Sequence, residues 1–213
     1  MNTTLLSSFH QELGNCNADE LYKIIESLQP DVIFEELPLE IFNTVYEKNY
    51  IPASLEAKAI KRYVDNYEIE HFPVDTYCFS YSELFSEFDF IANNSQEYLK
   101  LFSYQIALIK KYGFQIINSH KFLALIENLQ NLEKEVLLKC ERNDLLEKYM
   151  IEREIHHKRE LVMLNNIYKY CSENQFNKAL FICGVEHRKP LSEKIKLVKN
   201  QFEVSINWQF YHD

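Results

Sequence analysis

The chain has 213 residues, of which 46% are hydrophobic and 26% charged, and its net charge is -9. This composition is typical of a folded globular protein, and the length predicts a single domain spanning residues 1–213. The negative charge argues against nucleic acid and anionic membranes as partners, because phosphate binding requires clustered lysine and arginine side chains.

The expected location is the cytoplasm. The N-terminal residues MNTTLLSSFH lack the basic and apolar regions of a signal peptide. No stretch approaches the roughly 18 apolar residues of a membrane span. The five cysteines are scattered and form no CxxC pair, which suits a reducing compartment and argues against a structural zinc site built on sulfur.

Strand-like and helix-like patterns alternate in the first third of the chain. Runs typical of strands lie at 4–9, 31–37 and 71–77. Apolar spacing of three and four predicts helices at 21–28, 39–50 and 54–68. Asn17, with Glu20 three residues later, resembles a capping box before the first of these helices. Pro73 suits the start of a strand or an edge strand.

A long helical block follows, from about residue 81 to residue 172, and Asn118 and Ser119 are natural N-cap candidates within it. We interpret residues 81–140 as a helical insertion or cap, through which a protein partner could bind. The pattern then returns to a strand at 179–185, a helix at 191–200 and a strand at 202–211. The last strand alternates apolar and polar residues, which predicts an edge strand with one solvated face.

These elements predict an α/β fold. We expect a mainly parallel central sheet of about five strands flanked by helices, with a large helical insertion before the fourth strand. Ligands of such sheets bind beyond the carboxyl ends of the strands. The sequence places acids and histidines at four of these ends: His10, then Glu35 and Glu36, then Asp75, then Glu186 and His187.

The predicted metal-binding set is His10, Glu35, Glu36, Asp75 and His187. Imidazole combined with carboxylate suits Zn, Mn, Fe or Ni, and a bound ion could generate hydroxide from water at neutral pH. The alternatives remain open. His187 could be a solvent-exposed residue at the start of a helix, and one of Glu35 and Glu36 could be an ordinary charged strand end.

A second group of polar residues lies on the helix predicted at 144–170. Glu152, His156 and Glu160 share one face, and Glu154 with His157 has the Glu-x-x-His spacing of di-iron helical proteins. The same spacing is also common in salt-bridged helix surfaces. We favour the surface interpretation for both histidines.

Five segments occur in a recognisable order: SSFHQE, LQPDVIFEELP, FPVD, RELVMLNNI and ALFICGVEHR. Together they resemble the TraB/Tiki and erythromycin-esterase-like/ChaN-like superfamily. Arg159 and Met163 match its R-x-x-x-M-x-x-N-I helix, and Gly184 with His187 matches its G-x-x-H strand end. Ser7 and Ser8 stand where the family has a glycine before the first histidine.

The resemblance implies a hydrolase that cleaves an ester or peptide bond of a small molecule or peptide, with or without a divalent metal. Glu36, Arg159, Glu186 and His187 would be its catalytic residues. Arg159 would bind a substrate anion or pair with Glu36. The alternative is a non-catalytic ligand-binding or protein-interaction module that retains the fold.

Overall fold

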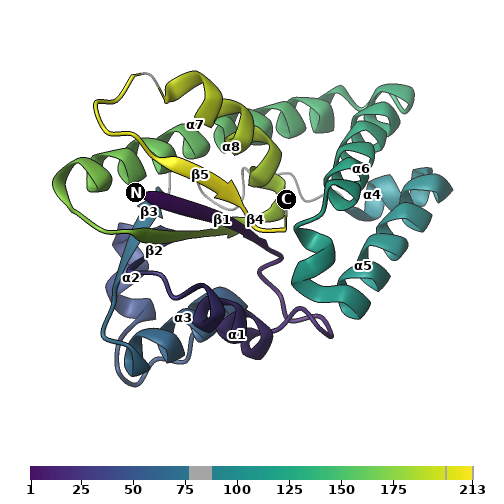
Figure 1. The fold of residues 1–213 in the computed structure, drawn as a ribbon. Coiled ribbons are helices and arrows are strands. Elements are labelled where there is room, and N and C mark those ends of the chain that lie inside the picture. Colours follow the sequence, from purple (N-terminus) through teal and green to yellow (C-terminus); the bar gives the residue numbers. More distant parts are fainter. Residues whose placement is uncertain (77–87, 200, 213) are drawn as a thin grey trace.

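The computed structural model describes residues 1–76, 88–199 and 201–212, and within them the chain forms an α/β fold around a five-stranded, all-parallel sheet (Figure 1). The strand order across the sheet is β3-β2-β4-β1-β5. The strands are β1 (Asn2–Ser8), β2 (Val32–Pro38), β3 (Glu70–Asp75), β4 (Lys178–Gly184) and β5 (Asn207–Phe210). The predicted fold class, including the helical block before the fourth strand, is confirmed.

The helices connect and cover these strands. They are α1 (Ala18–Leu28), α2 (Leu39–Val45), α3 (Leu55–Asn66), α4 (Phe88–Asn94), α5 (Gln96–Ile117), α6 (His120–Lys139), α7 (Asn143–Glu173) and α8 (Val185–Val198). Residues 81–87, the first part of the predicted helical block, lie outside the described residues.

The two faces of the sheet carry separate hydrophobic clusters. Side chains alternate between the faces along a strand, so Ile33 of β2 joins the cluster beneath α1 and α3, whereas Val32 and Phe34 join the cluster beneath α7 and α8. In Figure 1, α1 and α3 lie below the sheet and α7 and α8 lie above it. Consecutive residues at a strand end therefore face different surroundings.

The sequences of β3 and β5 suit their positions at the two edges of the sheet. β3 pairs only with β2, so Pro73 removes no hydrogen bond from a central strand. β5 pairs only with β1 and alternates exposed and half-buried residues, as predicted for an edge. It is shorter than the predicted strand 202–211, because only Asn207–Phe210 align with β1.

Two of the predicted N-caps form, and a third residue has a different role. The side chain of Asn17 accepts a hydrogen bond from the Glu20 N–H at the start of α1, and Ser119 accepts one from Phe122 at the start of α6. Asn118 is instead the C-cap residue of α5, and its buried amide reaches the end of β1. There it accepts from the Ser7 N–H at 2.8 Å and donates to the Ser7 carbonyl at 3.0 Å.

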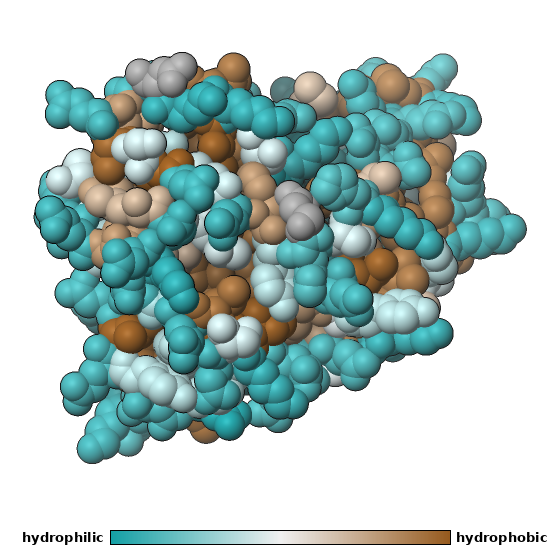
Figure 2. All heavy atoms as spheres, viewed as in Figure 1, coloured by the Kyte–Doolittle hydropathy of each residue, from teal (hydrophilic) through white to brown (hydrophobic). Residues whose placement is uncertain are grey.

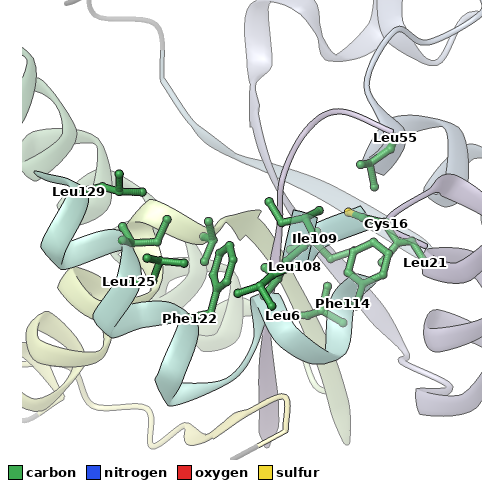
Figure 3. Packing of buried hydrophobic residues seen from close by; sticks show 14 of the residues in the cluster. Leu6, Cys16, Leu21, Leu55, Leu108, Ile109, Phe114, Phe122, Leu125 and Leu129 are labelled. Atoms are coloured by element: carbon green, nitrogen blue, oxygen red, sulfur yellow. The ribbon is translucent and has the colours of Figure 1, made fainter. Parts of the chain in front are cut away.

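Helices α5 and α6 lie beyond the carboxyl ends of the strands, at the right of Figure 1. Their buried side chains continue the core beneath α1 and α3: Figure 3 shows Leu108, Phe114 and Phe122 close to Leu6 of β1. Gly113 interrupts α5 with a φ of 55°, and a Cβ there would lie 2.4 Å from the Asn15 carbonyl oxygen. Only glycine fits this turn.

Helix α8 begins earlier than the sequence indicated. The predicted helix started at residue 191, after Pro190, but α8 starts at Val185 and contains Pro190. Burial of Val185, His187, Arg188 and Leu191 favours the longer helix despite the backbone hydrogen bond that proline cannot donate. Glu186 and His187 thus lie in the first turn of a helix.

Hydrophilic side chains cover much of the face shown in Figure 2, with hydrophobic residues in patches between them. Among the described helices, none combines the length and the hydropathy that a membrane crossing requires.

Candidate functional site

A cleft of about 420 Å³ opens at the carboxyl edge of the sheet, between the strand ends and the helical block. Such a volume is in the usual range for small-molecule sites, about 300–1,000 Å³. The strand side contributes His10, Glu36, Gly184 and His187 to its lining. These residues come from β2, from the last residue of β4 and from the segments that follow β1 and β4.

Glu36 is the centre of the polar wall. Its Oε2 accepts a hydrogen bond of 2.6 Å from the Gly184 N–H, and its Oε1 accepts one of 2.7 Å from Arg159. His187 Nε2 lies 3.2 Å from the same Oε1, and His10 Nε2 lies 3.8 Å from Oε2. Burial alone would raise the pKa of Glu36, but the charges of His187, His10 and Arg159 hold it far below its usual range.

Arg159 joins the end of β3 to this centre. Its Nε and Nη2 both donate to Asp75, with Nη2–Oδ2 at 2.5 Å, while Nη2 also donates to Glu36. Burial opposes the charge of the guanidinium, but these two carboxylates raise its pKa above the ordinary value. Asp75 therefore supports Arg159 from behind and does not line the cleft.

His187 is buried between two carboxylates. Its Nδ1 lies 2.8 Å from Glu160 Oε1, opposite the contact of Nε2 with Glu36, and Lys194 donates to Glu160 Oε2 at 2.6 Å. Burial would lower the pKa of His187, but the two carboxylates raise it to about 10. The ring is thus an imidazolium at neutral pH.

His10 is the member of this network with the most exposed side chain, at 51%. It adopts a left-handed φ of 60° directly after β1. Glu56 Oε1 makes two contacts with His10: it accepts a hydrogen bond of 3.0 Å from the backbone N–H, and it lies 3.2 Å from the ring Nδ1. Desolvation lowers the pKa of His10, but the hydrogen bond and charge of Glu56, with the charge of Glu36, raise it to about 9.

The charges of the network balance. Four carboxylates face four cationic side chains when both imidazoles are protonated: Glu36, Glu56, Asp75 and Glu160 against His10, His187, Arg159 and Lys194. Pairing of this kind offsets the large cost of burying charge. It also explains why both histidines hold their protons so strongly.

Helix α7 contributes a second polar row to the cleft. His156 lies 5.1 Å from the His187 ring, centroid to centroid, and burial together with the charges of His187, Arg153 and Arg159 lowers its pKa to about 3. His156 is therefore a neutral imidazole. Arg153 Nη2 lies 3.3 Å from Glu186 Oε2, and both side chains line the cleft.

The surface interpretation of the two α7 histidines is wrong for one of them. His156 lines the cleft, whereas His157 is exposed and does not. Glu154 is also exposed and pairs with Lys158 at 3.5 Å.

Glu35 lies apart from the cleft. Because adjacent strand residues point to opposite faces, Glu35 faces away from Glu36. It bonds to Tyr46, and its Oε1 lies 2.5 Å from His71 Nδ1. Glu36 is thus the member of the acidic pair that faces the cleft.

The helical block contributes both polar and apolar side chains to the opposite side of the cleft, the polar ones including Gln105, Gln130 and Glu133. Phe102 of α5 and Ile126 and Leu129 of α6 line the cleft there. A ligand that fills the cleft would contact these apolar side chains as well as charged and polar groups.

In the arrangement observed, the side chains predicted to bind a metal contact other groups of the protein, and the divalent ion stays a prediction. Both oxygens of Glu36 already accept hydrogen bonds, and the ring nitrogens of His187 each face a carboxylate. Across the described ranges, no group of three or more histidine, cysteine or acidic side chains is arranged to hold an ion.

Three members of the network were not predicted as site residues: Glu56, Glu160 and Lys194. Glu56 lies in the first turn of α3, where acids are common for local reasons. Glu160 did carry a signal, since its spacing from His156 places both on one face of α7. Its burial, which distinguishes it from a surface acid, depends on the packing of α8.

Comparisons of this chain with family models, with curated proteins and with solved structures find no match. The resemblance to the TraB/Tiki and erythromycin-esterase-like superfamily stays a prediction from short motifs. The site is therefore interpreted from its own geometry.

Proposed function

We propose that the protein is a hydrolase that cleaves an ester or peptide bond of a small molecule or peptide bound in the cleft. The observation that carries the proposal is that two histidines line one cleft in opposite electrostatic environments: His10 faces the carboxylates of Glu56 and Glu36, whereas His156 lies beside the His187 ring. His10 supplies a proton donor and His156 supplies a proton acceptor at the same pH. Environments that push the pKa values of two groups apart are typical of acid–base sites.

The proposed reaction uses water as the nucleophile. Water attacks the carbonyl carbon while His156 accepts one of its protons, and the bond from carbon to the leaving oxygen or nitrogen breaks as His10 donates a proton to that atom. Solvent then carries the proton from His156 back to His10, so that the enzyme is unchanged. General acid–base groups of this kind typically contribute 10²–10⁴-fold each to a rate, roughly.

The buried residues hold these two histidines in place. Glu56 fixes the ring of His10, and Glu36 adds the charge that keeps it protonated. The imidazolium of His187 beside His156 keeps the latter neutral. In this proposal Glu36, Arg159 and His187 position and tune the reacting groups, while Glu186 lines the cleft.

A non-catalytic binding module is the alternative, and the saturated ion pairs favour it. Charged side chains that pair with one another can stabilise the protein and shape a binding site without taking part in a reaction. An assay of the purified protein with a panel of fluorogenic esters and short peptides distinguishes the two proposals. Turnover supports the hydrolase, and its absence across the panel refutes it.

The assay includes His10→Gln and His156→Gln, with His157→Gln on the exposed side of α7 as the matched control. We expect the first two to lose about 100-fold or more in kcat/KM and the control to be unchanged. We also expect kcat/KM to fall as the pH rises through about 9, where His10 loses its proton. Full activity of His10→Gln would contradict its role.

The divalent ion suggested by the sequence is tested separately, because no step above requires it. Elemental analysis of the dialysed protein measures bound metal, and activity is compared before and after treatment with a chelator. A stoichiometric ion whose removal abolishes turnover would replace the acid–base proposal with a metal-dependent one.

A further inference from the structure

Arg153 and Arg159 line the same cleft but differ in what their guanidinium groups bind. Arg159 uses Nε and Nη2, the two donors on one side of the guanidinium, for Asp75. In Arg153 the same two donors are poorly used. Its Nη2 has a single contact of 3.3 Å with Glu186, and within the described part of the chain its buried Nε has no hydrogen-bond partner.

The contact between Arg153 and Glu186 is weak by the usual measures. Charge-assisted hydrogen bonds of this type are normally about 2.7–2.9 Å long. The Glu186 side chain is 48% exposed, and ion pairs at such positions contribute little, about 0–1 kcal/mol. A ligand carboxylate could therefore compete with Glu186 for Nη2 of Arg153.

The guanidinium of Arg153 is held in position before any ligand binds. Its Cζ lies 5.3 Å from the centre of the buried Tyr149 ring, within the range of a cation–π contact. A donor that is already ordered loses less entropy when it binds an anion. The start of α8 lies in the same wall, and the positive end of its helix dipole favours negative charge there.

We infer that Arg153 is a specificity-determining residue that binds a carboxylate of the substrate. The carboxylate accepts from Nε and Nη2 together and displaces Glu186, while the apolar part of the substrate lies against Phe102, Ile126 and Leu129. The substrate class is thus an amphipathic compound with a free carboxylate. This assignment rests on the proposed function only for the bond that is cleaved, because the binding site is defined independently.

The test measures binding by calorimetry with 3-phenylpropanoate, its neutral amide 3-phenylpropanamide, and phenyl phosphate. We expect the wild-type protein to bind the carboxylate about tenfold or more tightly than the amide, the effect of roughly one bidentate charged pair. Equal affinities for the two, or no binding of the carboxylate, would overturn the inference. Tighter binding of phenyl phosphate would overturn the assignment to a carboxylate.

Three variants and a control locate the effect. Arg153→Met is expected to abolish the preference for the carboxylate, and Arg153→Lys, which keeps the charge but loses the paired donors, to reduce it severalfold. Glu186→Gln is expected to bind the carboxylate more tightly, since the negative charge that competes for Arg153 is gone. Arg62→Met, the same charge change on α3, leaves the preference intact. A preference that survives in both Arg153 variants refutes the assignment.

Turnover distinguishes this inference from the proposed function. If the wild-type protein binds the carboxylate through Arg153 but hydrolyses no ester, the assignment of Arg153 as the carboxylate-binding residue stands and the hydrolase proposal fails. If the wild-type protein and Arg153→Met both hydrolyse neutral esters just as well as esters that carry a carboxylate, the hydrolase proposal stands and the assignment of Arg153 fails.

Discussion

The protonated state of His187 gives a strong and specific dependence of stability on pH. In the folded protein its pKa is raised from 6.5 to about 10 by Glu36 and Glu160, against the effect of burial. A histidine whose pKa rises on folding stabilises the protein fully below the unfolded pKa, and this contribution is lost as the pH rises through the folded pKa. The relevant window is therefore pH 6.5 to 10.

The magnitude follows from the shift. The pKa moves by 3.5 units, from 6.5 to about 10, and each unit corresponds to about 1.4 kcal/mol, so the contribution is on the order of 5 kcal/mol. Relative to a variant without this group, the free energy of unfolding is expected to fall by about 1.4 kcal/mol per pH unit across the window. This is a large share of the roughly 5–15 kcal/mol that stabilises a typical protein.

The assay is urea unfolding of the wild-type protein and His187→Gln, followed by circular dichroism at intervals between pH 6 and pH 10. His10 titrates in the same window and is present in both proteins, so most of its contribution cancels in the difference between the two curves. His157→Gln, which removes an exposed histidine of α7, is expected to follow the wild type. Parallel curves for the wild type and His187→Gln would show that His187 is neutral in the folded protein and refute the reasoning.

Three further substitutions test other parts of the site. Glu36→Gln leaves Arg159 and its neighbouring imidazolium without their shared carboxylate, and we expect a loss of about 3–5 kcal/mol in the free energy of unfolding, measured by urea titration. Asn118→Ala removes the buried amide that joins the helical block to β1, and should cost about 3 kcal/mol by the same measurement, since its hydrogen bonds with the Ser7 backbone and with Arg188 are lost. Gly184→Ala places a Cβ 2.5 Å from His10 Nε2 and so should displace the His10 ring while the protein stays folded. We expect a normal circular dichroism spectrum and a kcat/KM reduced about 100-fold.

Local patterns in the sequence predicted most of the fold. The apolar runs of β1, β2 and β4 and the helical spacing of α1 and α3 are properties of short segments, and each was predicted with boundaries within three residues of those observed. The parallel sheet followed from the alternation of these segments. The start of α8 was missed, because Pro190 is a local signal against a helix and the burial that outweighs it comes from distant segments.

The site was predicted in part for the same reason. The acids and histidines at the strand ends predicted His10, Glu36, Asp75 and His187 as site residues. In the structure His10 and His187 contact Glu36, and Arg159 joins Glu36 to Asp75. The sequence could not assign Glu35 to the opposite face without the register of β2. Nor could it distinguish Glu160, which is buried beneath α8, from an acid on the surface of α7.

The sequence by itself therefore determined the α/β class, the helical block and the edge of the sheet at which polar groups gather, because these depend on periodicity and chain order. Only the tertiary structure decided the protonation of the two site histidines and of His156. A pKa depends on charges within a few ångströms, and those charges come from β2, α3, α7 and α8, which are separate segments of the chain. The same packing commits Arg159 to carboxylates of the protein and leaves Arg153 available to a ligand.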